Sequence, residues 1–143
     1  DVCIAGAPGK SLKDYQLAIA KGIAVHFSRT HELLSKAQFA WVASGTATLE
    51  AALLGTPHLI AYKTSPLTFA IAKRLARIEH IGLPNLLMGQ TVVPGLIQQD
   101  MTPPALLEHT TGDDPTAAFA SLRQQLGGPG AIKRMAQRLV ALR

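Results

Sequence analysis

The stretch VASGTATLEAALLGTPHLIAY, residues 42–62, decides the fold predicted for this chain. It continues an apolar run, residues 39–43, which is rich in aromatic and β-branched side chains and is typical of a strand buried on both faces. Small residues at 44–46 break this run, and residues 47–54 favour a helix that a glycine and a proline then end. A second strand is expected over residues 59–62. The pattern therefore predicts a strand–helix–strand unit with parallel strands.

The turn Ser44-Gly45-Thr46 between strand and helix is a candidate binding site. A helix that begins at Gly45 or Thr46 directs unpaired backbone N–H groups and a partial positive charge outward, which suits a diphosphate. Glu50 follows Thr46 by four residues and shares its helix face, so its carboxylate can accept hydrogen bonds from a pair of sugar hydroxyls. The alternative is structural: Ser44 only caps the helix, and Glu50 only interacts with the helix dipole.

Composition indicates one folded domain that favours anionic partners. The chain has 143 residues, of which 48% are hydrophobic and 16% charged, so it suits a domain with a sizeable core and is not disordered. The net charge of +5 and a pI near 9.7 favour nucleotides or acidic lipid surfaces. Nucleic acid is not expected as a partner, because aromatic residues make up only 5% and the basic residues are scattered.

Cysteine usage and hydropathy predict a reducing compartment and no membrane span. The single cysteine, Cys3, excludes an internal disulfide. No run of about 18 apolar residues is present, and the first residues do not resemble a signal peptide. Because the sequence opens inside an apparent strand at residues 2–5, we expect it to be a fragment. No metal site is predicted, since no acid, cysteine or further histidine keeps ligand spacing with His26 and His31.

Strands and helices alternate along the rest of the chain, which predicts a mainly parallel α/β sheet. Further strands are expected over residues 2–5 and 23–27, and from residue 80 to a Pro84-Asn85 turn. Helices are expected over residues 12–21, 30–34, 67–78, 115–126 and 131–142, and after Met101, with Thr30 and Thr102 as N-caps. Residues 6–11 resemble a phosphate loop, but two residues stand where that motif has four, so they are interpreted as a turn.

Three other features have both a functional and a structural interpretation. His26, at the carboxyl end of a predicted strand, lines a ligand pocket or is a partly buried structural histidine. Asn85 offers a donor and an acceptor to a ligand or only stabilises its own turn. The basic amphipathic helix over residues 67–78 lies on an anionic membrane or is an ordinary solvated helix. The residues alone thus predict an α/β module with a nucleotide-diphosphate site.

Five motifs follow one another along the chain: SGTATLEA (44–51), AYKTSPLT (61–68), AKRL (72–75), LPNLL (83–87) and VVP (92–94). Together they resemble the C-terminal domain of lipid-A-disaccharide synthase, a family of inverting glycosyltransferases (family 19) with two Rossmann-like domains in the GT-B arrangement. The resemblance spans roughly residues 2–111. It implies an α/β fold: a Rossmann-like parallel sheet with flanking helices in residues 1–112, an incomplete C-terminal domain without its first strand–helix unit. Residues 113–143 would be helices that pack toward the absent N-terminal domain.

The resemblance also implies a reaction. 2,3-Diacylglucosamine is transferred from its UDP donor to 2,3-diacylglucosamine 1-phosphate, which gives the β-1,6-linked lipid A disaccharide 1-phosphate and UDP without a metal or cofactor. The catalytic residues are expected in the N-terminal domain. The implied donor contacts are Ser44, Gly45 and Thr46 at the diphosphate, Glu50 at the ribose hydroxyls, Asn85 near the donor in the cleft and His26 at the uracil.

The implied partners are the UDP-diacylglucosamine donor, a lipid acceptor at the membrane and an anionic membrane surface, and a homo-oligomer is compatible with the family. The complete protein would be cytoplasmic and peripheral on the inner face of the bacterial inner membrane.

Several departures from the family pattern affect the phosphate contacts. The family's Leu-Pro-Gly-Ser-Arg motif is absent, Lys63 and Gln90 stand where arginine is usual, and Gly95 replaces a usual glutamate. Because a lysine cannot form the bidentate contact of an arginine, we expect some phosphate binding to be weaker. The family's acceptor-side domain, with its expected catalytic carboxylate, is also absent, so we expect this chain alone to bind the donor weakly and to be inactive. Two alternatives are another GT-B enzyme that uses a UDP-sugar, similar to the peptidoglycan glucosaminyltransferase, and a non-catalytic nucleotide-binding α/β module.

Overall fold

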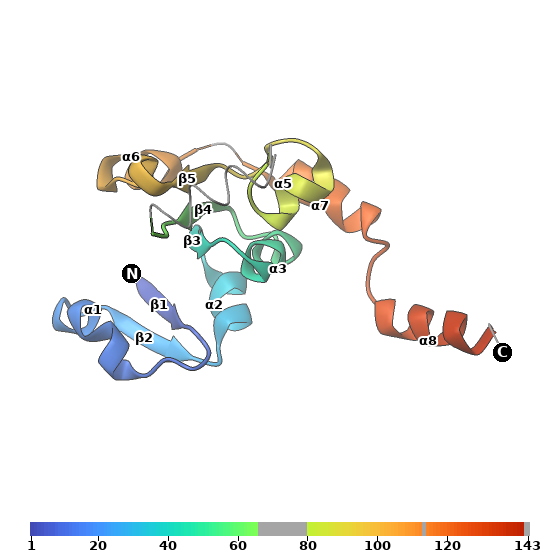
Figure 1. Ribbon diagram of the computed structural model, residues 1–143, viewed down its shortest axis with the longest axis horizontal. Coiled ribbons are helices and arrows are strands. Elements are labelled where there is room, and N and C mark those ends of the chain that lie inside the picture. The colour runs from blue at the N-terminus through green and yellow to red at the C-terminus, as the bar shows by residue number, and fades with distance from the viewer. Residues whose placement is uncertain (66–79, 113, 142–143) are drawn as a thin grey trace.

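The computed structural model of the chain describes residues 1–65, 80–112 and 114–141, and it is an α/β structure (Figure 1). Its strands are β1 (Cys3–Gly6), β2 (Ala24–Phe27), β3 (Ala40–Ala43), β4 (His58–Tyr62) and β5 (Gly95–Ile97). Its helices are η1 (Leu12–Tyr15), α1 (Gln16–Ala20), α2 (Thr30–Lys36), α3 (Thr46–Leu54), α5 (Leu83–Met88), η2 (Gln98–Asp100), α6 (Pro103–Thr110), α7 (Thr116–Gln125) and α8 (Ala131–Ala141). The predicted fold class is confirmed.

The strands of the described residues form two parallel sheets. In the first sheet β1 pairs with β2, and Cys3 lies opposite Ala24. In the second sheet the order is β3-β4-β5, so β4 is the central strand. Leu59 and Ile60 of β4 are fully buried, as expected of a strand covered on both faces. The β3–α3–β4 unit therefore has the order and the parallel pairing that residues 42–62 predict.

The α3 helix ends where the sequence predicts. Gly55 has a left-handed backbone with φ of 85°, which a glycine adopts without steric cost. The N–H of Gly55 donates to the carbonyl oxygen of Ala52 at 3.1 Å, and the N–H of Thr56 donates to that of Ala51 at 2.9 Å. Because Ala51 and Ala52 are fully buried, α3 packs closely against its neighbours, and its first turn is held at the carboxyl end of β3.

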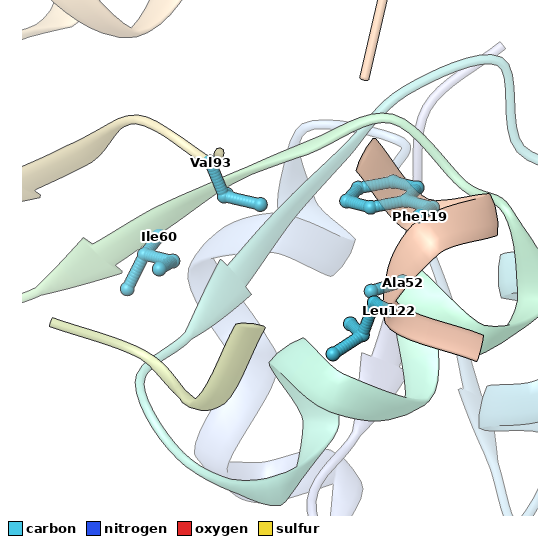
Figure 2. Close-up of a cluster of buried hydrophobic side chains, with 5 residues drawn as sticks. All are labelled: Ala52, Ile60, Val93, Phe119 and Leu122. Carbon is cyan, nitrogen blue, oxygen red and sulfur yellow. The ribbon is translucent and has the colours of Figure 1, made fainter. Parts of the chain in front are cut away.

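The main hydrophobic cluster joins segments that lie far apart in the sequence. It consists of Ala52 of α3, Ile60 of β4, Val93 before β5, and Phe119 and Leu122 of α7 (Figure 2). Burial of a large apolar side chain contributes about 1.5–3 kcal/mol, so α7 is an integral part of this core although it follows residue 112. The expected boundary at residue 112, and the packing of later helices toward an absent domain, stay predictions.

A second cluster lies between α2, β3 and α3. Its buried members are Leu34, Val42 and Ala51. In addition, the hydroxyl of Thr56 donates a hydrogen bond to the carbonyl oxygen of Leu34 at 2.8 Å. These contacts, made by the C-terminal part of α2, fix that helix relative to α3, which determines the geometry of the site below.

The strand predicted from residue 80 to the Pro84-Asn85 turn is wrong, because residues 83–88 form the helix α5. Pro84 lies in its first turn, where the missing N–H of proline costs no hydrogen bond. Gly82, with φ of 85°, turns the chain into this helix. The β5 strand (Gly95–Ile97) is not predicted by the sequence pattern, since three residues are too few to show periodicity.

The helix starts agree with expectation only in part. The helix predicted over residues 12–21 begins as the 3₁₀ turn η1 and continues as α1. Thr30 is the first residue of α2 rather than its cap. Thr102 caps α6 as predicted, because its hydroxyl accepts a hydrogen bond from the N–H of Ala105 at 3.4 Å. The helix predicted over residues 67–78 lies outside the described residues.

The last helix, α8, follows the glycine-rich residues 127–130 and extends away from the two sheets (Figure 1). The predicted helix over residues 131–142 is confirmed as far as residue 141. None of the residues of α8 is buried, and it presents apolar side chains such as Ile132 and Val140 to solvent.

Candidate functional site

The segments that follow β2 and β3 hold the polar residues of the candidate site. In α/β proteins ligands bind at the carboxyl ends of parallel strands, and here two such ends meet although β2 and β3 belong to different sheets. The turn after β2, the start of α2 and one residue of α3 line an open hollow of about 370 Å³, a size that admits a small polar ligand. Its lining residues are Ser28, Arg29, Thr30, His31, Glu32 and Glu50.

Gly45 gives the turn before α3 a backbone conformation that is essentially restricted to glycine. Its φ is 153° and its ψ is −163°. A Cβ atom at Gly45 would meet no other atom within 4 Å, so a ligand can approach this backbone closely. The carbonyl oxygen of Gly45 accepts hydrogen bonds from the hydroxyl of Thr48 at 2.7 Å and from its N–H at 3.2 Å. These two bonds fix the first turn of α3.

Ser44 does not cap α3. The N-cap position is Gly45, which has no side chain, and the Ser44 hydroxyl has no hydrogen-bond partner in the part of the chain that the structure describes. The first N–H groups of a helix need acceptors from outside the helix. The turn therefore presents a hydroxyl and backbone donors that suit an anion.

Glu50 forms a hydrogen bond that links two helices. Its Oε2 atom lies 2.9 Å from Nε2 of His31, at the start of α2. The His31 side chain is 72% exposed and that of Glu50 is 40% exposed. Glu50 is beyond the first turn of α3, which holds no acidic residue, so an interaction with the helix dipole does not explain its position.

The other carboxylate of the hollow is already neutralised. Arg29 donates two hydrogen bonds to Glu32, at 2.7 and 2.8 Å, and Lys36 donates a third at 2.9 Å. These bonds, those from Arg29 first, lower the pKa of Glu32 to about 2, and the same contact raises the pKa of Arg29. Glu50 therefore differs from Glu32, because its one partner among the described residues is His31 and it keeps acceptor positions for a ligand.

A second hollow, of about 330 Å³, adjoins the first along the ends of β1 and β2. It is lined by residues 6–10 and by Phe27, and Ser28 and Thr30 line both hollows. Ser28 has a left-handed φ of 57°, which turns the chain from β2 toward α2. The two hollows therefore share their boundary at the turn after β2.

His26 lies in β2, one residue before its end, and pairs with Ala5 of β1. Side chains alternate along a strand, so His26 and Phe27 point to opposite faces, and it is Phe27 that lines a hollow. The structure places His31, and not His26, beside Glu50. Contact of His26 with a uracil stays a prediction.

Asn85 has a structural role that the sequence leaves open. Its side chain is 2% exposed, and its amide group donates to the carbonyl oxygens of Ile81 at 2.9 Å and Val93 at 2.8 Å. Its carbonyl oxygen accepts from the N–H groups of Val92 at 2.8 Å and Val93 at 2.9 Å. Three of the four hydrogen bonds thus join α5 to the segment before β5, and the fourth, to Ile81, holds the chain that leads into α5. A contact between Asn85 and a ligand stays a prediction.

The described residues contain no group of three histidine, cysteine, aspartate or glutamate side chains that could hold a metal ion. In residues 1–65, 80–112 and 114–141 no helix has the length and the apolar composition needed to cross a membrane.

Comparison with known sequences relates this site to one family. The model of the family described as lipid-A-disaccharide synthetase matches residues 11–112, which include the turn at 44–46, Glu50, His31 and Asn85. This chain belongs to the lipid-A-disaccharide synthase family. The resemblance carried by the five sequence motifs is thereby confirmed.

Curated members of the lipid-A-disaccharide synthase family match most of this chain. The synthase of Trichlorobacter lovleyi is 43% identical over 126 residues, which cover 80% of this chain and 32% of that protein. The synthase of Anaeromyxobacter sp. (strain K) is 38% identical over 122 residues, with the same two coverages. That of Geobacter metallireducens is 37% identical over 139 residues, 88% of this chain and 36% of that protein. The chain thus spans about a third of the length of these relatives.

Proposed function

We propose that this chain is the donor-binding part of a glycosyltransferase that makes the lipid A disaccharide. The complete protein transfers 2,3-diacylglucosamine from UDP-2,3-diacylglucosamine to 2,3-diacylglucosamine 1-phosphate, with inversion at the anomeric carbon, and releases UDP. The observation that carries the proposal is the uncapped, glycine-dependent turn at the start of α3, with Glu50 on the same helix beside a hollow. Membership of the family supports the choice of substrates.

The turn binds the diphosphate. The nine-residue α3 helix directs its partial positive charge and its first N–H groups at the turn. Ser44 contributes a hydroxyl, and Gly45 and Thr46 contribute backbone that a phosphate oxygen can approach. Lys63 follows β4, the strand next to β3, and adds a cation at the same edge of the sheet.

The hollow beside Glu50 receives the nucleoside. Glu50 accepts hydrogen bonds from the two ribose hydroxyls, and the residues that follow β2 surround the base. Neither His26 nor Asn85 lines this hollow. Asn85 keeps the Leu-Pro-Asn segment in shape through its four internal hydrogen bonds.

The chemical role of this chain is to hold and stabilise the leaving group. The acceptor hydroxyl attacks the anomeric carbon, the bond between that carbon and the phosphate oxygen breaks, and the acceptor's proton passes to a base in the N-terminal domain. Negative charge develops on the β-phosphate, where backbone N–H groups and a lysine stabilise it without a metal. Because that base and the acceptor site are on the other domain, the chain alone is inactive.

The lipid nature of both substrates also determines the partners that we propose. The complete protein works in the cytoplasm, at the inner face of the bacterial inner membrane, as a peripheral protein, alone or as a homo-oligomer. The net charge of +5 favours its contact with anionic lipid. Residues 1–112, completed by α7, form the donor-binding domain, and another part of residues 113–143 contacts the N-terminal domain.

Steady-state kinetics of the full-length protein tests the proposal. We expect the protein to form the disaccharide from the two lipid substrates. In the Glu50→Gln variant the KM for the UDP donor should rise about tenfold, while the KM for the acceptor should not change. A Glu108→Gln variant on the exposed surface of α6 is the control and should keep both constants. An unchanged donor KM in Glu50→Gln would contradict the assignment of Glu50 to the donor.

A further inference from the structure

We infer that His31 is a positioning residue: its imidazole holds the Glu50 carboxylate in the orientation in which it accepts the ribose hydroxyls. The inference rests on the proposed function, which assigns Glu50 to the ribose. The two side chains come from different helices, 19 residues apart, and meet at the hollow that both of them line.

The direction of the hydrogen bond follows from the chemistry of the two groups. An ionised carboxylate only accepts hydrogen bonds, so Nε2 of His31 carries the proton and donates to Oε2 of Glu50. The Oε1 atom of Glu50 has no partner among the described residues. A carboxylate has about four acceptor positions, so Glu50 can hold His31 and still accept from two neighbouring hydroxyls.

The fold does not depend on this hydrogen bond. Exposed polar contacts of this kind contribute little to stability, and the His31 side chain is 72% exposed. The α2 and α3 helices are already joined by the cluster around Leu34 and Ala51 and by the buried hydrogen bond from Thr56 to Leu34. The contact therefore orients the flexible Glu50 side chain before the ligand binds. Without it, the conformational entropy that this side chain loses on binding would lower the affinity.

The nearby cations do not replace His31 in this role. Arg29, the N-cap of α2, and Lys36, its last residue, are both hydrogen-bonded to Glu32. Arg29 and Lys36 thus donate to Glu32, and His31 is the residue that donates to Glu50. The arrangement pairs each carboxylate of the hollow with its own partners.

Calorimetric titration of the full-length protein with UDP and with 2′,3′-dideoxy-UDP tests the inference. We expect His31→Leu to weaken UDP binding about threefold to fivefold and to leave binding of the dideoxy analogue unchanged. His31→Gln, whose amide can donate from a similar position, should retain most of the affinity for UDP. In a Glu50→Gln background the His31→Leu effect on UDP should disappear. Ser35→Ala, on an exposed position of α2, is the matched control and should bind both nucleotides normally.

Two results would overturn the inference, and they are distinguishable. If His31→Leu weakens both nucleotides equally, or weakens UDP as much in the Glu50→Gln background, His31 does not act through Glu50, while the proposed function stands. If Glu50→Gln weakens the binding of UDP no more than it weakens the binding of the dideoxy analogue, the ribose assignment fails, and the inference fails with it. An unchanged urea midpoint of His31→Leu would show that a loss of affinity does not come from unfolding.

Discussion

His58 stacks on Phe119, with ring centroids 5.5 Å apart and ring planes inclined by 25°. The contact joins the central strand β4 to α7. Nδ1 of His58 donates to the carbonyl oxygen of Thr56 at 2.9 Å, and its Nε2 atom has no partner in the described structure. Burial lowers the pKa of His58, although its hydrogen bond to Thr56 acts in the opposite direction. A charged ring would lose its water here without gaining an acceptor at Nε2.

Stability should therefore decrease as the pH falls below about 6.5, the ordinary pKa of histidine in an unfolded chain. In that range the unfolded state binds a proton at His58 more readily than the folded state, so protonation favours unfolding. The free energy of urea unfolding, measured between about pH 7.5 and 5.5, should fall less steeply in His58→Gln than in the wild type. His109→Gln on α6 is the control, and its free energy of unfolding should fall as steeply as that of the wild type. If the free energy of unfolding of His58→Gln also falls as steeply as that of the wild type, another group is responsible.

The four hydrogen bonds of Asn85 predict a loss of stability on a nearly isosteric substitution. Asn85→Asp places an oxygen against the carbonyl oxygens of Ile81 and Val93, which lose their donor. We expect a cost of at least about 2 kcal/mol in the free energy of unfolding. Gln90→Glu makes the same chemical change at an exposed position five residues later and should cost little. If Asn85→Asp instead keeps its stability and loses UDP affinity, Asn85 contacts the ligand.

The backbone of Gly45 predicts that an added methyl group affects both folding and binding. Gly45→Ala forces alanine into a conformation that costs about 1–3 kcal/mol, although the space around it is open. The turn should shift and UDP affinity should fall, whereas affinity for uridine, which has no diphosphate, should change less. Gly89→Ala, at another open position with φ of 62°, should lower stability to a similar extent without changing UDP affinity. If the Gly45→Ala and Gly89→Ala variants bind UDP with equal affinity, the turn at Gly45 does not bind the diphosphate.

The position of α7 predicts that residues 1–112 do not form a complete core. Phe119→Ala should cost about 3–5 kcal/mol, because its ring is fully buried against α3 and β4 (Figure 2). Leu107→Ala, at a side chain that is 64% exposed, should change the free energy of unfolding by less than about 0.5 kcal/mol. Chemical unfolding of both variants provides the comparison. A stable Phe119→Ala variant would support a domain boundary at residue 112.

The sequence predicts well what depends on local patterns. The β3–α3–β4 unit is correct because the small turn residues, the alanine-rich helix and Gly55 all specify the same structure. The segment around Pro84 is wrong because a proline in the first turn of a helix resembles a proline in a loop. The pairing of His31 with Glu50 could not be predicted, since it depends on how Leu34 and Ala51 pack two separate helices together.

The most direct test of the donor site is a nuclear magnetic resonance titration of the isotope-labelled chain with UDP, with ADP as the control. Dispersed amide signals first establish that the chain is folded. We predict saturable shifts for the amides of residues 44–50 and of residues 28–32, stronger with UDP than with ADP and weakened by Glu50→Gln. Saturable UDP shifts that fall elsewhere in the chain, with the amides of residues 44–50 unmoved, would contradict the proposed site.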